Sequence, residues 1–296
     1  MPSLKEIRNR VRTVKNTQKI TRAMKLVAAA KLRRAQEGVE AARPYASKLR
    51  EVIGALVADA DDDAHPYFVA YDEPSRALYV AFTSDRGLCG GFNSSLIRHT
   101  LRTLREQDGG YDELGVAAVG KKGRGAFARA GRRSERVSFA EVLALADADV
   151  ASKMAATLGE AFAEGEVHEV YLVYNEFISA LTQEVVIEQL LPLTTDSFED
   201  AEEGKASDAL VERIWEPDRA SLLESLVPKY IENRIYRAML ESVASEQGAR
   251  MTAMDNATSN ATDLIDNLTL SMNRARQAII TTELMEITSG AESLKG

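Results

Sequence analysis

The chain has 296 residues and 45% of them are apolar, so it is long enough to bury one or two hydrophobic cores. It contains no run of about 18 apolar residues, which argues against a membrane-spanning helix. Its N-terminus shows neither the apolar region nor the cleavage site of a secretory signal, so we expect no export. The single cysteine, Cys89, excludes an internal disulfide framework and fits a reducing compartment.

The net charge of −8 is distributed unevenly. Residues 1–36 contain eleven Lys or Arg and one acid, Glu6, for a net charge of +10, which leaves −18 on the remainder. A strongly basic end on an acidic protein suggests either an acidic partner surface or nucleic acid.

The N-terminal segment has the pattern of a long amphipathic helix. Ser3 and Glu6 have the spacing of a capping box, which predicts that the helix begins at Leu4. Its apolar seam consists of Leu4, Ile7, Val11, Val14, Met24, Val27 and Ala28. Pro44 is expected to kink or end this helix, with a second helical piece from Tyr45 to Ala58.

A stripe of positive charge runs beside this seam. Its members are Lys5, Arg8, Arg12, Lys15, Lys19 and Arg22, which are spaced alternately three and four residues apart. A solvated face is the simplest interpretation of such a run. Like charges one turn apart destabilise a helix, however, by a few tenths of a kcal/mol per pair. We therefore favour an acidic surface that this basic stripe contacts.

The middle of the chain changes from a helical to a strand period after an acidic linker and Pro66. We expect strands at 77–82, 116–119, 170–177 and 184–191, and helices at about 93–105, from 124 to Ala130, and at 149–164. The last two strands are close enough in sequence to form a hairpin edge. Strands that alternate with helices predict a mostly parallel, right-handed, Rossmann-like α/β sheet.

Two glycine-rich loops in this domain resemble phosphate-binding loops. One spans 85–91 and the other begins at Gly120 and is expected to remain a loop to Gly123. Neither matches a known phosphate-loop consensus, so tight strand-to-helix turns are the simpler explanation. No base is placed to activate Cys89, and His65, His99 and His168 lack metal-ligand spacing. We therefore predict no catalytic, metal or cofactor site.

The C-terminal part begins with an acidic loop over 194–208 and continues as one very long helix. Asp218 is a plausible N-cap, and 229–289 could form a single helix of roughly 90 Å. Its expected apolar seam is Leu264, Leu268, Met272, Ala275 and Ile279. Two long terminal helices around one insertion predict an antiparallel two-helix coiled coil. The expected division is a coiled-coil helix at 1–58, the α/β domain at 75–192, a connector at 193–217 and the second coiled-coil helix at 218–296.

Three stretches resemble the γ subunits of F-type, proton-transporting ATP synthases. Residues 7–31 read IRNRVRTVKNTQKITRAMKLVAAAK and are similar to the N-terminal helix of that family. Residues 280–293 read ITTELMEITSGAES and match its C-terminal signature at every fixed position. Residues 84–93, SDRGLCGGFN, are similar too. The resemblance covers essentially the whole chain.

The resemblance implies a rotor shaft without a catalytic residue or cofactor of its own. In the family, the two helices form an asymmetric coiled coil inside a ring of three α and three β subunits. The α/β domain lies below, against the ε subunit and the membrane ring of c subunits. Rotation of the shaft then drives each β subunit through its nucleotide-binding states.

The family pattern also assigns contact residues. The β subunits would be contacted by Arg8, Arg12, Lys15, Met24, Arg276, Gln277, Thr281 and Glu283. The ε subunit and the c ring would be contacted by Arg213, Trp215 and Glu216. The redox-regulated plant branch carries an inserted cysteine pair, which a chain with Cys89 alone lacks. With no transit peptide before the first motif, we expect a bacterial enzyme on the cytoplasmic side of the plasma membrane.

Two other functions remain open from the residues alone. A nucleic-acid-binding coiled coil would explain the basic end, although no aromatic residues are placed there for stacking. A nucleotide-dependent α/β enzyme would explain the middle of the chain but leaves both long helices without a purpose. Co-purification with α, β and ε subunits, with nucleic acid, or with nothing would discriminate among the three.

Overall fold

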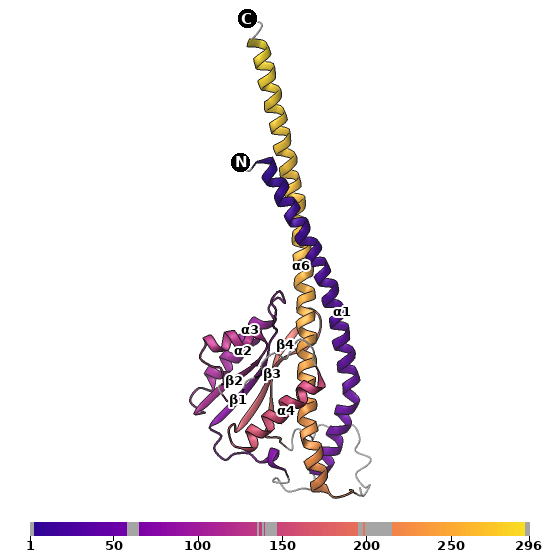
Figure 1. The fold of residues 1–296 in the computed structure, drawn as a ribbon, viewed down its shortest axis with the longest axis vertical. Coiled ribbons are helices and arrows are strands. Elements are labelled where there is room, and N and C mark those ends of the chain that lie inside the picture. The colour runs from indigo at the N-terminus through magenta and orange to yellow at the C-terminus, as the bar shows by residue number, and fades with distance from the viewer. Residues whose placement is uncertain are drawn as a thin grey trace. The chain divides into compact units, whose positions relative to one another are not determined.

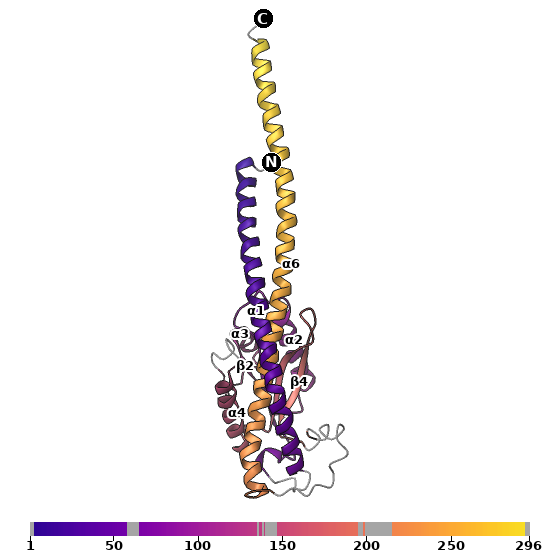
Figure 2. The same cartoon turned by 90° about the vertical axis from the view of Figure 1, so that its right-hand side faces the viewer.

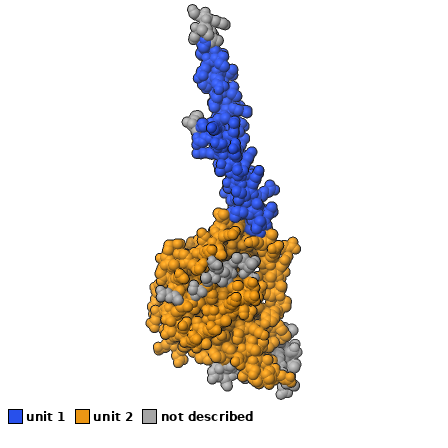
Figure 3. Space-filling view, in the orientation of Figure 1, with its two compact units in different colours: residues 1–28, 251–296 blue, residues 29–250 orange. Residues whose placement is uncertain are grey.

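The computed structural model describes residues 3–57, 65–134, 136, 137, 139, 147–194, 198 and 215–293. In chain order the elements are α1 (Leu4–Val57), η1 (Pro66–Phe68), β1 (Arg76–Phe82), α2 (Phe92–Glu106), β2 (Glu113–Val119), α3 (Lys121–Arg129), α4 (Ala148–Ala163), β3 (Glu169–Phe177), β4 (Gln183–Leu191) and α6 (Arg219–Ser293) (Figures 1 and 2). They form two compact units, which Figure 3 colours separately. Unit 1 comprises 1–28 and 251–296, and unit 2 comprises 29–250.

Unit 2 contains a four-stranded sheet with the strand order β2-β1-β3-β4. β1 pairs in parallel with both β2 and β3, whereas β4 pairs antiparallel with β3. Strand β1 is therefore central, and its residues Ala77–Phe82 form an unbroken buried run, as expected for a strand covered on both faces. The predicted mostly parallel sheet with a hairpin edge is confirmed.

Helices cover both faces of this sheet (Figure 1). On one face, α2 and α3 contribute Leu96, Leu104 and Phe127 to a core with Tyr79 and Val173. On the other face, α4 and the unit 2 parts of α1 and α6 form a larger core. The sheet is thus the middle layer of unit 2, and α6 is one of the elements packed on it.

Helix α1 continues through Pro44, so the predicted separate helical piece from Tyr45 to Ala58 is wrong. A proline inside a helix removes one backbone hydrogen bond and costs roughly 3 kcal/mol. The residues after Pro44 offset that cost, because Leu49, Ile53 and Leu56 are almost completely buried in the larger core. Tertiary packing therefore outweighs the local preference.

Helix α6 has 75 residues; it begins at Arg219, directly after the predicted N-cap, and continues past 289 to Ser293. Asp218 caps its start as predicted, because its carboxylate accepts hydrogen bonds from the Ser221 backbone N–H at 2.9 Å and from the Ser221 hydroxyl at 2.8 Å. Pro228 lies inside the helix, and Val227 and Ile231 beside it are fully buried. Packing again carries the helix past a proline.

In unit 1, α1 and α6 pair antiparallel. Three contacts set the register: Gln18 with Thr262, Thr21 with Thr258, and Lys25 with Asp255. In each pair the residue numbers add up to about 280, so Leu4 lies across from about residue 276. The part of α6 after that level has no partner helix among the described residues of unit 1 (Figure 2).

Three predicted seam positions are wrong, and one of them is Ile279, which is 45% exposed and lies beyond the level of Leu4. Leu264 is 47% exposed, whereas its neighbour Ile265 is buried, and Val27 is 57% exposed, whereas Ala28 is buried. The observed seam of α6 includes Met254, Thr258, Ala261, Ile265, Leu268 and Met272. These positions alternate in steps of four and three, as expected for a two-helix coiled coil.

Candidate functional surfaces

The carboxyl edge of the sheet in unit 2 is where open α/β folds usually bind a ligand. The loop after β1 is folded onto the start of α2. The side-chain oxygen of Asn93 accepts a hydrogen bond from the Ser84 N–H at 3.0 Å, and its Nδ2 donates to the Ser84 hydroxyl at 2.8 Å and to the Cys89 sulfur at 3.2 Å. Leu88 and Gly90 adopt positive φ angles of 65° and 55°. This glycine-rich loop is a closed turn held by its own side chains.

The second glycine-rich segment is the start of α3, because the helix begins at Lys121 and the loop predicted to run to Gly123 is wrong. Its first three amide groups donate to the Asp85 carboxylate at 2.9 Å, the Ser84 carbonyl at 3.1 Å and the Thr83 hydroxyl at 2.8 Å. These are the groups that would bind a phosphate at a helix N-terminus.

Gly120 explains why this approach needs glycine. Its φ is 93°, and a Cβ there would lie 2.0 Å from the Thr83 carbonyl oxygen. The glycines therefore allow two loops to pack together and supply acceptors for the helix start. As a result, the Thr83–Asp85 segment occupies the position at the start of α3 where a nucleotide-binding protein would hold a phosphate.

Helix α6 lies across the same edge. The Ser242 hydroxyl donates to the Phe82 carbonyl at the end of β1 at 3.4 Å, and the Ser245 hydroxyl donates to the Asn175 carbonyl in β3 at 2.9 Å. The Glu241 carboxylate accepts from the Phe177 N–H at 3.1 Å. We call Glu241, Ser242 and Ser245 the α6 seat.

One turn further along α6, Arg250 reaches the loop after β1. Its guanidinium donates to the Arg86 and Gly87 carbonyls at 3.4 and 3.3 Å and pairs with Glu246 at 2.5 Å. Burial raises the pKa of Glu246, and the Arg250 guanidinium only partly offsets that effect. The carboxyl edge of the sheet is therefore filled by the chain's own helix.

Cys89, His65 and His168 make structural contacts within unit 2. Cys89 is 2% exposed and packs with Phe92 and Ala249. The Nδ1 atoms of His65 and His168 accept hydrogen bonds from the backbone N–H groups of Tyr67 and Ser75, both at 3.1 Å. Burial lowers the pKa of His65. In the described part of the chain, no three His, Cys, Asp or Glu side chains are grouped as metal ligands would be.

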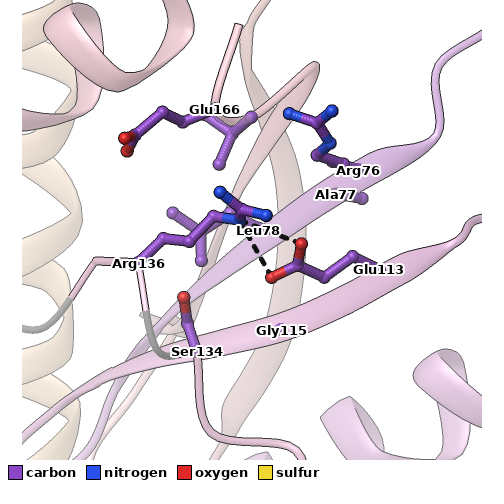
Figure 4. Close-up of a pocket in the computed structure, with 9 residues that line it drawn as sticks. Arg76, Ala77, Leu78, Glu113, Gly115, Ser134, Arg136 and Glu166 are labelled. Carbon is purple, nitrogen blue, oxygen red and sulfur yellow. Dashed lines mark hydrogen bonds and ion pairs between the residues drawn. The ribbon is translucent and has the colours of Figure 1, made fainter.

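A small pocket lies at the opposite, amino edge of β1 and β2 (Figure 4). Arg136 crosses it and forms two hydrogen bonds with the Glu113 carboxylate, at 2.9 and 3.1 Å. The pocket has a volume of about 10 Å³, which is the space of one water molecule. A hollow of about 370 Å³ lies in unit 2 between Tyr45 of α1, Ala148 of α4 and Tyr236 of α6. Ser134 and Glu113 both line the first space, but the Ser134 hydroxyl accepts a hydrogen bond from the Val137 N–H and the Glu113 carboxylate is paired with Arg136.

The predicted basic stripe lies on α1 in unit 1. Lys5, Arg8, Arg12, Lys15, Lys19 and Arg22 are all exposed. None of them forms an ion pair with the residues that the structure describes; Glu6 pairs with Arg10 instead, at 3.4 Å. The stripe is thus a continuous row of uncompensated positive charge.

The other predicted contact residues lie on both units. Arg276, Gln277, Thr281 and Glu283 are exposed on α6, and Met24 is half-buried on α1. Glu216 is exposed, whereas Trp215 packs against the larger core of unit 2. Arg213 lies outside the described residues, as do most of the acidic loop at 194–208 and the acidic linker before Pro66.

The sequence reading missed a polar section in the seam of unit 1. Gln18 Nε2 donates to the Thr262 hydroxyl at 2.7 Å, the Thr21 and Thr258 hydroxyls are 2.7 Å apart, and Lys25 pairs with Asp255 at 2.6 Å. Continuing the alternating spacing from Val14 would have placed Gln18, Thr21 and Lys25 in the seam. A seam defined by apolar residues alone does not include them.

A long antiparallel helix pair, interrupted by an α/β domain whose ligand edge is closed by its own helix, defines a coiled-coil stalk protein. Among the described residues, no helix is both long and apolar enough to cross a membrane. The family model for ATP synthase matches residues 3–294. The ATP synthase gamma chain of Geobacter sp. (strain M21) is 50% identical over 296 residues, covering 100% of both chains. The chain therefore belongs to the ATP synthase γ chain family.

Solved structures agree with this assignment. A chain of the central stalk and c-ring structure of the Tetrahymena thermophila mitochondrial ATP synthase is 26% identical, with a TM-score of 0.57 over 80% of this chain and 99% of that one. A chain of the Euglena gracilis mitochondrial ATP synthase in rotational state 3 is 24% identical, with a TM-score of 0.69 over 98% of this chain and 94% of that one. The second likeness concerns the fold alone.

Proposed function

We propose that this chain is the central rotor shaft of a rotary ATP synthase. It couples proton flow through the membrane ring mechanically to ATP synthesis or hydrolysis in the α/β catalytic head. Membership of the γ chain family and the likeness to a central stalk solved with its c ring support this role. The observation that carries it is α6, a helix of 75 residues that continues past the level of Leu4 with exposed Ile279, Ile280 and Leu284. A segment with apolar side chains on several faces needs a surrounding partner.

The chain has no catalytic site of its own in this proposal. The helix start that could bind a phosphate has intramolecular acceptors, and α6 lies where a nucleotide would bind. The partners therefore supply the chemistry, and this subunit supplies movement. The catalytic nucleotide sites belong to the head.

We further propose which residues contact each partner. The basic stripe, with Arg8, Arg12 and Lys15, faces acidic segments of the β subunits, because opposite charge is what an uncompensated row of cations attracts. Met24, Arg276, Gln277, Thr281 and Glu283 contact the β subunits as well. Arg213, Trp215 and Glu216 contact the ε subunit and the c ring. The complex is bound to the membrane, and this chain lies on the cytoplasmic side of a bacterial plasma membrane.

Purification of the tagged chain from its own membranes tests the proposal. We expect α, β, ε and c subunits to co-purify, and ATP hydrolysis by that complex to drive proton pumping. The chain purified alone should not hydrolyse ATP. Co-purification of nucleic acid in place of these subunits, or turnover by the chain free of α and β, would contradict it.

A further inference from the structure

The α6 seat joins the helix to two different strands of the sheet. Ser242 binds the end of β1 at Phe82, and Ser245 and Glu241 bind β3 at Asn175 and Phe177. Glu241, Ser242 and Ser245 are 9%, 1% and 0% exposed. Each bond is made to a main-chain group. The three hydrogen bonds therefore depend on the position of the strands and not on the identity of their side chains.

Small residues bring the helix close enough to form these bonds. Ala244, Gly248 and Ala249 lie on the same stretch of α6, and Ala244 and Ala249 are buried. A Cβ on Gly248 would lie 3.0 Å from the Phe177 ring and 3.4 Å from the Ala180 Cα. The hairpin between β3 and β4 therefore also packs directly against the helix.

Apolar packing and directional bonds hold α6 in different ways. The larger core covers the N-terminal part of α6, from Leu223 to Met239. Because the hydrophobic effect is non-directional, packed apolar surfaces allow small sliding movements. Buried hydrogen bonds lose their energy over a fraction of an ångström and leave costly unpaired groups when broken. Directional bonds to the sheet and its loops are also made by Arg234, to Glu188 and the Gln189 carbonyl, and by Arg250, to the Arg86 and Gly87 carbonyls. The seat is the buried member of this set, and it resists displacement of β1 and β3 along or around α6.

We propose that Glu241, Ser242 and Ser245 are positioning residues that lock the α/β domain to α6, so that the domain turns with the shaft as one body during the rotary cycle. This inference rests on the proposed function. It assigns to the ligand edge of the sheet a mechanical role: torque passes between domain and helix through this joint.

The test uses the whole ATP synthase reconstituted into vesicles. The double variant Glu241→Ala with Ser245→Ala removes two bonds, whereas Glu241→Gln with Ser245→Thr retains an oxygen acceptor and a hydroxyl donor. We expect the alanine variant to hydrolyse ATP at nearly the parent rate and to pump several-fold fewer protons per ATP, with faster amide exchange at 82–91 and 175–182. The conservative variant should resemble the parent. Unchanged pumping per ATP in an alanine variant whose exchange shows an opened seat would overturn the proposal.

A crosslink keeps the proposal testable if the alanine variant fails to assemble. Gly248→Cys with Ala180→Cys, made in a Cys89→Ser background, places two cysteines across this contact, because a Cβ on Gly248 would lie 3.4 Å from the Ala180 Cα. The reduced double-cysteine complex is the baseline, since a Cβ on Gly248 also lies 3.0 Å from the Phe177 ring. If the α6 seat stays closed throughout the rotary cycle, oxidation of the two cysteines should leave hydrolysis and pumping unchanged. Loss of either on oxidation, restored by reductant, would show that the joint must open. If the parent complex itself does not couple, the proposed function fails, whatever the variants do.

Discussion

Reversal of three charges in the basic stripe should uncouple the enzyme without unfolding the chain. We consider the variant Arg8→Glu, Arg12→Glu and Lys15→Glu. All three side chains are exposed on α1 in unit 1 and form no ion pair with the described residues. Surface substitutions of this kind change stability by about 0.5 kcal/mol or less each, so the fold should lose at most about 1.5 kcal/mol.

The effect on the partner surface is larger. The substitutions turn a row of cations with i,i+3 and i,i+4 spacing into a mixed face, so acidic β segments would meet like charge. Like-charge juxtaposition at an interface costs several kcal/mol, and every 1.4 kcal/mol corresponds to a tenfold change in an equilibrium constant. We therefore expect a large fall in ATP-driven proton pumping and an unfolding midpoint close to that of the parent.

The assay compares pumping with hydrolysis in the same vesicles. The matched control is Arg98→Glu, Arg105→Glu and Arg129→Glu, three exposed cations on α2 and α3 of unit 2. It makes the same change in net charge away from the stripe and should pump normally. Salt should weaken the defect of the stripe variant, because exposed charges are screened over about 8 Å at physiological ionic strength. Equal pumping by both triple variants would mean that the stripe is only a solvated face.

Three further predictions follow from the structure. In the isolated chain the amides of residues 277–290, which have no partner helix among the described residues of unit 1, should exchange quickly, and assembly should protect them; fast exchange in both states would show that the partner subunits do not enclose this segment. Glu188→Gln should destabilise unit 2 by about 2 kcal/mol at neutral pH. Burial alone would raise the pKa of Glu188, but the Arg234 guanidinium and the Tyr174 hydroxyl outweigh it and lower that pKa. The contribution of the ionised Glu188 carboxylate to the free energy of unfolding should therefore be complete above the unfolded-state pKa of about 4.3 and disappear as the pH falls below it. A difference in unfolding free energy between parent and variant that does not shrink in acid would contradict this. Because Cys89 is the single cysteine and is buried, dithiol reductant should leave the ATPase rate of the assembled enzyme unchanged, and a change abolished by Cys89→Ser would reveal a missed switch.

Local signals predicted most elements of the fold. The capping residues Ser3 and Asp218 mark the starts of α1 and α6, and the Ser3 hydroxyl does accept the Glu6 N–H at 3.3 Å. The buried run at 77–82 predicted the central strand, and the short separation of β3 and β4 predicted the hairpin. These features succeed because each depends on residues close together in sequence. The proposed limits of the four chain segments stay predictions.

The wrong predictions at Pro44 and Leu264 share one physical cause, which is long-range packing. Pro44 and Pro228 are local helix breakers, but both helices continue because buried neighbours compensate. The choice between Leu264 and Ile265 as the seam residue depends on the rotation of α6 against α1, and apolar spacing alone left it open. Three cross-helix contacts fix that rotation, and all three are between polar or charged residues that an apolar pattern does not include.

The candidate surfaces were predictable to different degrees. The basic stripe could be read from spacing, because exposure on a helix follows from its neighbours in sequence. The α6 seat could not be, because Glu241, Ser242 and Ser245 bind main-chain groups about 65 to 160 residues away and have no motif of their own. Contact assignments for Arg276, Gln277 and Thr281 came from resemblance, and their exposure on α6 permits a partner without naming it.

The glycine-rich loops show why a motif must be judged by its acceptors. Glycine at position 120 is required by a φ of 93° and by the approach of Thr83, and a phosphate loop would require glycine for the same reasons. What differs is the group that receives the helix amides. Here the Asp85 carboxylate and the Thr83 hydroxyl supply two of the three acceptors, and α6 covers the remaining edge through the seat. A sheet edge built to hold a nucleotide and one built to hold a helix can therefore share their glycines. The Asp85 carboxylate binds the start of α3 and would repel a phosphate. Its presence in the loop after β1 therefore argues that this sheet edge holds a helix and not a nucleotide.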